Sequence, residues 1–150
     1  MISVLLTPPD DPKAFVRLLT ALVPAVAEGL VREVAVIGAT GPFHAIADDA
    51  GAGLYDDFAA ALAKAKGPWL AGVPGGAGLV SDWMDHVAAH LAVEPARPAR
   101  LAVRSSGISL GGGPEGWLVP KALAASAVVV EQDLQRLARR AVRLRVLERR

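Results

Sequence analysis

Asp82, His86 and His90 are the residues whose spacing most resembles a metal site. They recur every four residues, so they would share one face of a helix, and such a histidine pair can chelate zinc. The sequence offers no evident fourth protein ligand. The alternative, which we favour, is that these side chains form the polar side of an ordinary helix. No metal site is therefore predicted.

A glycine-rich turn, Gly38-Ala39-Thr40-Gly41, follows the apolar residues 34–37. Glycines between a strand and a helix let a pyrophosphate approach the helix N-terminus, which makes a dinucleotide cofactor a candidate ligand. However, His44 stands where the third glycine of that motif belongs, and the turn follows the second predicted strand instead of the first. We favour a structural turn and keep dinucleotide binding as an alternative.

Three other segments favour no particular chemistry. Residues 74–78, Pro-Gly-Gly-Ala-Gly, lack the Lys and Ser/Thr of a phosphate loop and carry no carboxylate for a divalent cation, so they indicate a flexible turn. Ser105-Ser106-Gly107 has no local base. The arginine-rich residues 136–150 could contact anionic lipid or a polyphosphate. The favoured alternative for this last segment is the solvated side of a helix.

The composition is that of one soluble domain. The chain has 150 residues, 16 Lys+Arg against 15 Asp+Glu, a net charge of +1 and 53% hydrophobic residues. Such a balance argues against a nucleic-acid-binding protein. No apolar run has the length of a membrane span, the N-terminus does not resemble a signal peptide, and the chain has no cysteine. We expect a single domain over residues 1–150, a cytoplasmic location and no transmembrane segment.

Alternating apolar runs and helical patterns predict an α/β fold. Strands are expected at residues 2–6, 34–37, 69–73, 100–104, 116–119 and 142–146. Helices are expected at residues 12–29, with a kink or restart at Pro24, and at 43–50, 58–66, 81–91, 121–126 and 131–140. This order predicts three layers, α/β/α, around a mostly parallel central sheet. Ligands of such sheets bind beyond the carboxyl ends of the strands, which singles out the loops 7–11, 38–42 and 74–78.

Nearly the whole chain resembles glycosyltransferase family 2, which has the GT-A fold, and especially the short bacterial members of that family. The similarity is carried by weak motifs in the family's order: residues 1–6, 19–25, 29–34, 45–52, 63–70, Trp83, Gly116-Trp117-Leu118-Val119-Pro120-Lys121-Ala122-Leu123, Glu131-Gln132-Asp133-Leu134 and Arg139-Arg140. The resemblance implies a nucleotide-diphospho-sugar transferase-like domain. Family members usually continue beyond the point where this chain stops.

The resemblance also implies where a nucleotide would bind. In the family the first strand ends in Pro-Thr-x-Asn, which contacts the nucleotide, and Thr7-Pro8-Pro9-Asp10 is similar in outline. Thr7, Pro8 and Asp10 are therefore expected at the nucleotide. The family's second strand ends in an Asp that hydrogen-bonds uracil. Ile37-Gly38 occupies that place here. Gly38 is therefore also expected at the nucleotide, although an apolar side chain cannot replace that base contact.

The catalytic groups that the resemblance implies are only partly present. The family's Asp-x-Asp pair, which holds Mg²⁺ or Mn²⁺, is replaced by Pro74-Gly75-Gly76, so the family's metal cofactor is expected to be lost. Glu131, with Asp133, falls at the acidic motif whose carboxylate serves as general base. The equally weighted alternative is that these carboxylates only favour a helix dipole.

Our leading hypothesis is a degenerate relative of the family with a binding or regulatory role. One alternative is an active, metal-independent transferase that uses a nucleotide-sugar and Glu131 as base; the other is a dinucleotide-binding domain. A nucleotide-sugar is the expected ligand. The last strand would leave an exposed sheet edge, which favours a homodimer or a partner protein covering it.

Overall fold

The computed structural model of the chain describes residues 1–75, 77–93, 96–101, 103–105, 116–127 and 142–143. Its helices are α1 (Pro12–Ala27), α2 (Pro42–Asp49), α3 (Phe58–Lys64), α4 (Trp83–Val93) and α5 (Lys121–Ala127). Its strands are β1 (Ile2–Leu6), β2 (Val31–Ile37), β3 (Gly53–Tyr55), β4 (Trp69–Val73), β5 (Ala77–Leu79), β6 (Ala99–Leu101), β7 (Val103–Ser105), β8 (Gly116–Pro120) and β9 (Val142–Arg143).

A mixed sheet forms the middle of the protein. Its strand order is β3-β2-β1-β4-β8-β6-β9, and β5 pairs with β7 in a separate small sheet. Strands β1 to β4 run parallel, whereas β8 runs antiparallel to both β4 and β6. Leu6, the last residue of β1, pairs with Val36 on one side and with Val73 on the other. The carboxyl ends of these parallel strands therefore meet at one edge of the sheet.

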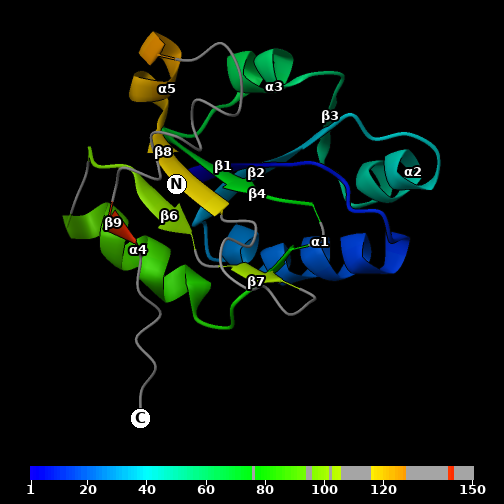
Figure 1. Ribbon diagram of the computed structural model, residues 1–150, viewed down its shortest axis with the longest axis horizontal. Coiled ribbons are helices and arrows are strands. Elements are labelled where there is room, and N and C mark those ends of the chain that lie inside the picture. Colours follow the sequence, from blue (N-terminus) through cyan, green and yellow to red (C-terminus); the bar gives the residue numbers. More distant parts are fainter. Residues whose placement is uncertain (76, 94–95, 102, 106–115, 128–141, 144–150) are drawn as a thin grey trace.

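Helices cover both faces of this sheet. One cluster of buried side chains joins the sheet to α1, α2 and α4, and a second joins its other face to α3 and α5. Figure 1 shows α1 and α4 below the sheet and α3 and α5 above it. Successive residues of β1 alternate between the two clusters, because Val4 belongs to the first and Leu5 to the second. The predicted three-layer fold with a mostly parallel sheet is confirmed.

Helix α1 forms because its N-terminus is capped and its apolar residues recur at helical spacing. The Asp11 carboxylate accepts hydrogen bonds from the backbone N–H of Lys13, at 3.1 Å, and of Ala14, at 3.2 Å. One stripe of α1 is buried against the sheet: Phe15, Leu18, Leu19, Leu22 and Ala25. The helix does not restart at Pro24, which was one of the two expectations for this residue. Pro24 lies in the last turn, and the helix runs on to Ala27.

Trp117 packs directly on the backbone of Gly72, its partner in the β4–β8 ladder. A Cβ atom at residue 72 would lie 1.9 Å from Cε2 of the indole ring. The ring is 1% exposed, and its edge meets Phe58, with ring centroids 6.3 Å apart. Only glycine at residue 72 leaves room for the indole of Trp117. The packing of the second cluster therefore depends on this glycine.

A buried polar link ties the turn before β4 to β1 and β2. The Ser3 hydroxyl donates to Oε1 of Glu33 at 2.7 Å and accepts from the N–H of Gly67 at 2.8 Å. The N–H of Lys66 also donates to Glu33 Oε1. Burial raises the pKa of Glu33, but these hydrogen bonds and the charges of Lys66 and Arg32 outweigh it and lower the pKa below the ordinary value of 4.5.

We expect Glu33→Gln to destabilise the protein at neutral pH by about 1 kcal/mol, because the amide accepts the Ser3 and Lys66 hydrogen bonds less strongly than the carboxylate. The lowered pKa makes the ionised carboxylate stabilising above its unfolded-state value of 4.5, and that contribution disappears as the pH falls through the lower folded-state pKa. Urea unfolding from pH 7 to pH 3 should therefore show the two curves converging in acid. Asp48→Asn, at an exposed carboxylate of α2, is the control and should keep the wild-type pH profile.

The structure differs from the sequence expectations at several short elements. Strand β3 was not expected, and residues 77–79 form β5 where a flexible turn was predicted. The strand expected at 100–104 is divided into β6 and β7, which belong to different sheets. The helix expected at residues 131–140 lies outside the described residues.

No helix in the described part of the chain combines the length and the apolar character that a membrane crossing requires.

Candidate functional site

The loops singled out in the sequence follow neighbouring strands at the carboxyl edge of the sheet. Thr7 and Pro8 follow β1, Gly38 follows β2 and Pro74 follows β4. The register places β1 between β2 and β4. The structure therefore brings Thr7, Pro8 and Gly38, together with Pro74 and Gly75 after β4, to one edge of the sheet, which we call the carboxyl edge. Glu131 and Asp133 lie outside the described residues.

The chain after β4 packs tightly on the chain after β1. A Cβ atom at Gly75 would lie 2.9 Å from the carbonyl oxygen of Pro8 and 3.0 Å from that of Thr7. Both neighbours are backbone atoms, so they cannot turn away as a side chain could. Any side chain at residue 75 requires the two loops to separate. The close approach of these two backbone segments therefore explains why residue 75 is a glycine.

The loop after β1 carries two carboxylates, Asp10 and Asp11, and only Asp11 is engaged in hydrogen bonds within the protein. Asp11 caps α1, because its carboxylate oxygens accept hydrogen bonds from backbone N–H groups at the start of that helix. Its ion pair with Arg17 is long, at 3.9 Å, and both side chains are exposed, so it adds little. Asp10 is exposed. Because Asp11 already fills the N-terminus of α1, an anionic ligand cannot use those donors, whereas Asp10 is accessible from solvent.

The turn after β2 is open to solvent. Gly38 and Gly41 have φ angles of +69° and +53°, and a Cβ atom at either would meet nothing within 4 Å. The N–H of Gly38 donates to the carbonyl of Tyr55 at 2.8 Å, which fixes the turn against β3. Helix α2 begins at Pro42, and its N-cap residue, Gly41, has no side chain that could cap the helix. These backbone positions can be approached closely by a ligand.

Sequence reasoning missed one acidic position at this edge. Asp56 directly follows β3, and β3 runs parallel to β2, so Asp56 stands at the end of the strand next to Gly38. The neighbouring Asp57 caps α3 by accepting from the N–H of Ala60 at 2.8 Å. The only sequence signal for β3 is the apolar pair Leu54-Tyr55 between Gly53 and Asp56, which is too short for periodicity to reveal a strand.

The histidines of α4 do not form a joint site. The His90 ring donates from Nε2 to the carbonyl of Arg97 at 2.7 Å and packs edge-on against Trp69, 5.9 Å away. His90 is 7% exposed, so the expectation that it lies on the solvated side of the helix is wrong. His86 instead pairs with Asp82 at 3.1 Å. In the part of the chain that the structure describes, no three acidic or histidine side chains gather as metal ligands.

Comparison with solved structures identifies the fold as that of a GT-A-like glycosyltransferase. Three crystal structures of glucosyl-3-phosphoglycerate synthase from Mycobacterium tuberculosis match at 16% sequence identity. The complex with Mn²⁺, UDP and glucosyl-3-phosphoglycerate has a TM-score of 0.68, over 96% of this chain and 70% of that one. The complex with phosphoglyceric acid alone gives 0.68 over 95% and 68%, and the complex with Mn²⁺, UDP and phosphoglyceric acid gives 0.62 over 85% and 58%.

No protein-family model and no curated protein sequence matches the chain.

Proposed function

We propose that the carboxyl edge binds a nucleotide-sugar without a divalent cation, and that the chain is a degenerate relative of glycosyltransferase family 2 with a binding or regulatory role. Thr7, Pro8, Asp10 and Gly38 are the proposed nucleotide contacts. We also propose that residues 1–150 form one such domain. The similar crystal structures hold UDP, which favours a uridine nucleotide as the first ligand to test.

The end of β4 carries this proposal. In the family that the sequence resembles, this strand end supplies the carboxylates that hold Mg²⁺ or Mn²⁺, but here it reads Val73-Pro74-Gly75. Gly75 cannot be replaced by an acidic residue without parting the loops after β1 and β4. A metal ion can contribute several kcal/mol of transition-state stabilisation. Without it, a transferase would be slower by about tenfold for each 1.4 kcal/mol lost.

Binding depends on groups other than a metal. The exposed carboxylate of Asp10 can accept hydrogen bonds from ribose or sugar hydroxyls, and the open backbone at Gly38 leaves room for a base. If the chain also transfers sugar without a metal, Glu131 and Asp133 are the carboxylates that we propose as base. Product formation that is lost in Glu131→Gln would favour this active alternative.

The test is thermal unfolding with UDP-glucose, GDP-mannose or NAD⁺, each with Mn²⁺ and with EDTA. Ligand at 100 times its Kd stabilises by about 2.7 kcal/mol, which in a chain of this size raises Tm by about 5–10 °C. We expect a nucleotide-sugar to give this shift equally in Mn²⁺ and in EDTA. Asp10→Ala should weaken binding about tenfold, because a charged acceptor is removed.

Asp85→Ala, at an exposed carboxylate of α4, is the matched control and should bind as the wild type does. A nucleotide-sugar shift that requires Mn²⁺ would contradict the proposal. A shift with NAD⁺ alone would favour the dinucleotide-binding alternative. If none of these ligands raises Tm, the proposed nucleotide-binding function is wrong.

A further inference from the structure

The outer face of α1 lacks the charges that normally solvate a surface helix. Residues 18–27 contain no charged side chain, although only one side of the helix is buried against the sheet. On the other side Val16, Val23 and Val26 are 46%, 61% and 46% exposed. Thr20 lies between them and is also exposed. We call Val16, Thr20, Val23 and Val26 the outer α1 patch.

The outer α1 patch forms one wall of an open groove of about 930 Å³. The other walls are the start of β2 and the segment from α2 to β3, including Ile46 and Gly51. Among the described residues β3 pairs only with residues 35–37 of β2, so no further strand covers the first half of β2 on this side. The proposed nucleotide contacts do not line the groove. It is therefore a different surface from the carboxyl edge.

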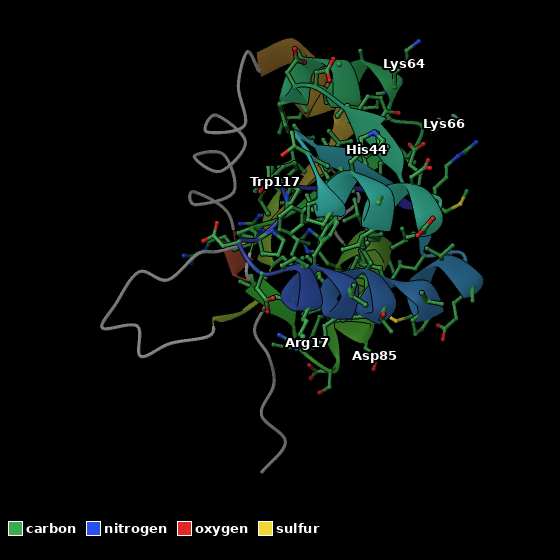
Figure 2. All side chains as sticks on the ribbon, turned by 90° about the vertical axis from the view of Figure 1, so that its right-hand side faces the viewer. Arg17, His44, Lys64, Lys66, Asp85 and Trp117 are labelled. Carbon is green, nitrogen blue, oxygen red and sulfur yellow. The ribbon has the colours of Figure 1, made fainter. Side chains whose placement is uncertain are left out.

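The charges around the groove have both signs. Arg32 and Lys66 are positive and Glu33 and Asp49 are negative. Glu33 already interacts with Ser3 and Lys66 of the same copy, and Figure 2 shows the side chain of Lys66 extending away from the body of the protein. A helix that lies on anionic membranes is usually rich in Lys and Arg on its polar face, and this rim is not. Two copies related by a two-fold axis can instead place Arg32 or Lys66 of one opposite Asp49 of the other. The net charge of +1 opposes such pairing only weakly.

We propose that the outer α1 patch and its groove are the interface of a homodimer. The two α1 helices lie antiparallel across a two-fold axis, and the valines of each copy enter the groove of the other. This arrangement covers the apolar side chains with an identical surface, as closed two-fold symmetry requires. The proposal does not depend on nucleotide binding.

The first test is the molar mass by light scattering across a concentration series. We expect the wild-type chain to approach twice 15.5 kDa at high micromolar concentration, and Val23→Glu to remain monomeric with an unchanged circular dichroism spectrum. Val93→Glu is the matched control, because Val93 is 75% exposed on α4 and does not line the groove. This variant should dimerise as the wild type does.

The second test uses the absence of cysteine from the chain. Thr20→Cys, near the middle of the patch, should form a disulfide-linked dimer under mild oxidation, whereas Val93→Cys should not. A wild-type chain that stays monomeric, or a dimer that survives Val23→Glu, would overturn the proposal. So would a monomer that floats with vesicles of neutral or anionic phospholipid, since the patch would then be a membrane-contacting surface.

Discussion

Gly72→Ala is expected to lower the free energy of unfolding by about 3 kcal/mol, at the upper end of the usual range for an overfilled core. The added methyl group would lie 1.9 Å from the buried indole of Trp117, and β4 is a central strand that cannot move aside. This is a large share of a total stability of roughly 5–15 kcal/mol. Tm should fall by about 6–12 °C. Urea unfolding and a thermal scan measure both quantities.

A double-mutant cycle separates the proposed clash from a general weakness of β4. Trp117→Leu removes the ring atoms that the new methyl group would meet, at the expense of a cavity. Gly72→Ala should then be less destabilising in the Trp117→Leu background by at least about 1 kcal/mol. Strict additivity of the two changes would show that the close approach is not what requires glycine.

Gly75→Asp is expected to destabilise the protein by about 2 kcal/mol and to create no Mn²⁺ site. The Cβ atom would meet the carbonyl oxygens of Pro8 and Thr7 at 2.9 and 3.0 Å, which forces apart two backbone segments. A single added carboxylate also leaves the cation with too few protein ligands. Urea unfolding gives the stability change, and titration calorimetry with Mn²⁺ gives the binding.

Gly75→Ala provides the control for this substitution. The Cβ atom causes the clash, so alanine should destabilise the protein nearly as much as aspartate. If aspartate alone were destabilising, its charge would be responsible and the close approach would not. Tight Mn²⁺ binding by the aspartate variant would show that further ligands are already in place at the carboxyl edge.

Most of the fold was predictable because its strands are apolar and sharply bounded. β1 and β4 begin and end where expected, since proline follows each closely and limits the run. The strands missed were those of three residues, such as β3 and β5, where pairing across the sheet decides the conformation and periodicity has no room to show. The alternation of strands and helices was enough for the three-layer arrangement.

The meeting of three loops at one edge of the sheet was predictable from the sequence, but the contacts among them were not. Strand order and direction brought the loops after β1, β2 and β4 to one edge, as the α/β pattern indicated. The packing of Gly75 on Pro8 joins residues far apart in the sequence, and no local pattern contains it. The burial of His90 against Trp69 is likewise a tertiary contact that outweighs the polar character of the residue.

In our proposal, the carboxyl edge of this glycosyltransferase-like fold binds a nucleotide-sugar without supporting metal-dependent transfer. Binding and catalysis use different groups, because binding can rest on hydrogen bonds to the nucleotide while transfer also needs the leaving diphosphate to be stabilised. In this chain Asp10 after β1 and Gly38 after β2 are exposed, whereas Gly75 after β4 packs on the backbone of Thr7 and Pro8 and has no room for a side chain. The proposed loss of the metal therefore removes transfer before it removes binding.

The most direct measurement is the ratio of the Kd for UDP-glucose in EDTA to that in Mn²⁺, obtained by titration calorimetry on the wild-type chain. Our account predicts measurable binding in both conditions and a ratio close to one, because no protein carboxylate at the end of β4 recruits the cation. A ratio of ten or more, equivalent to at least about 1.4 kcal/mol of metal-dependent binding, would contradict it.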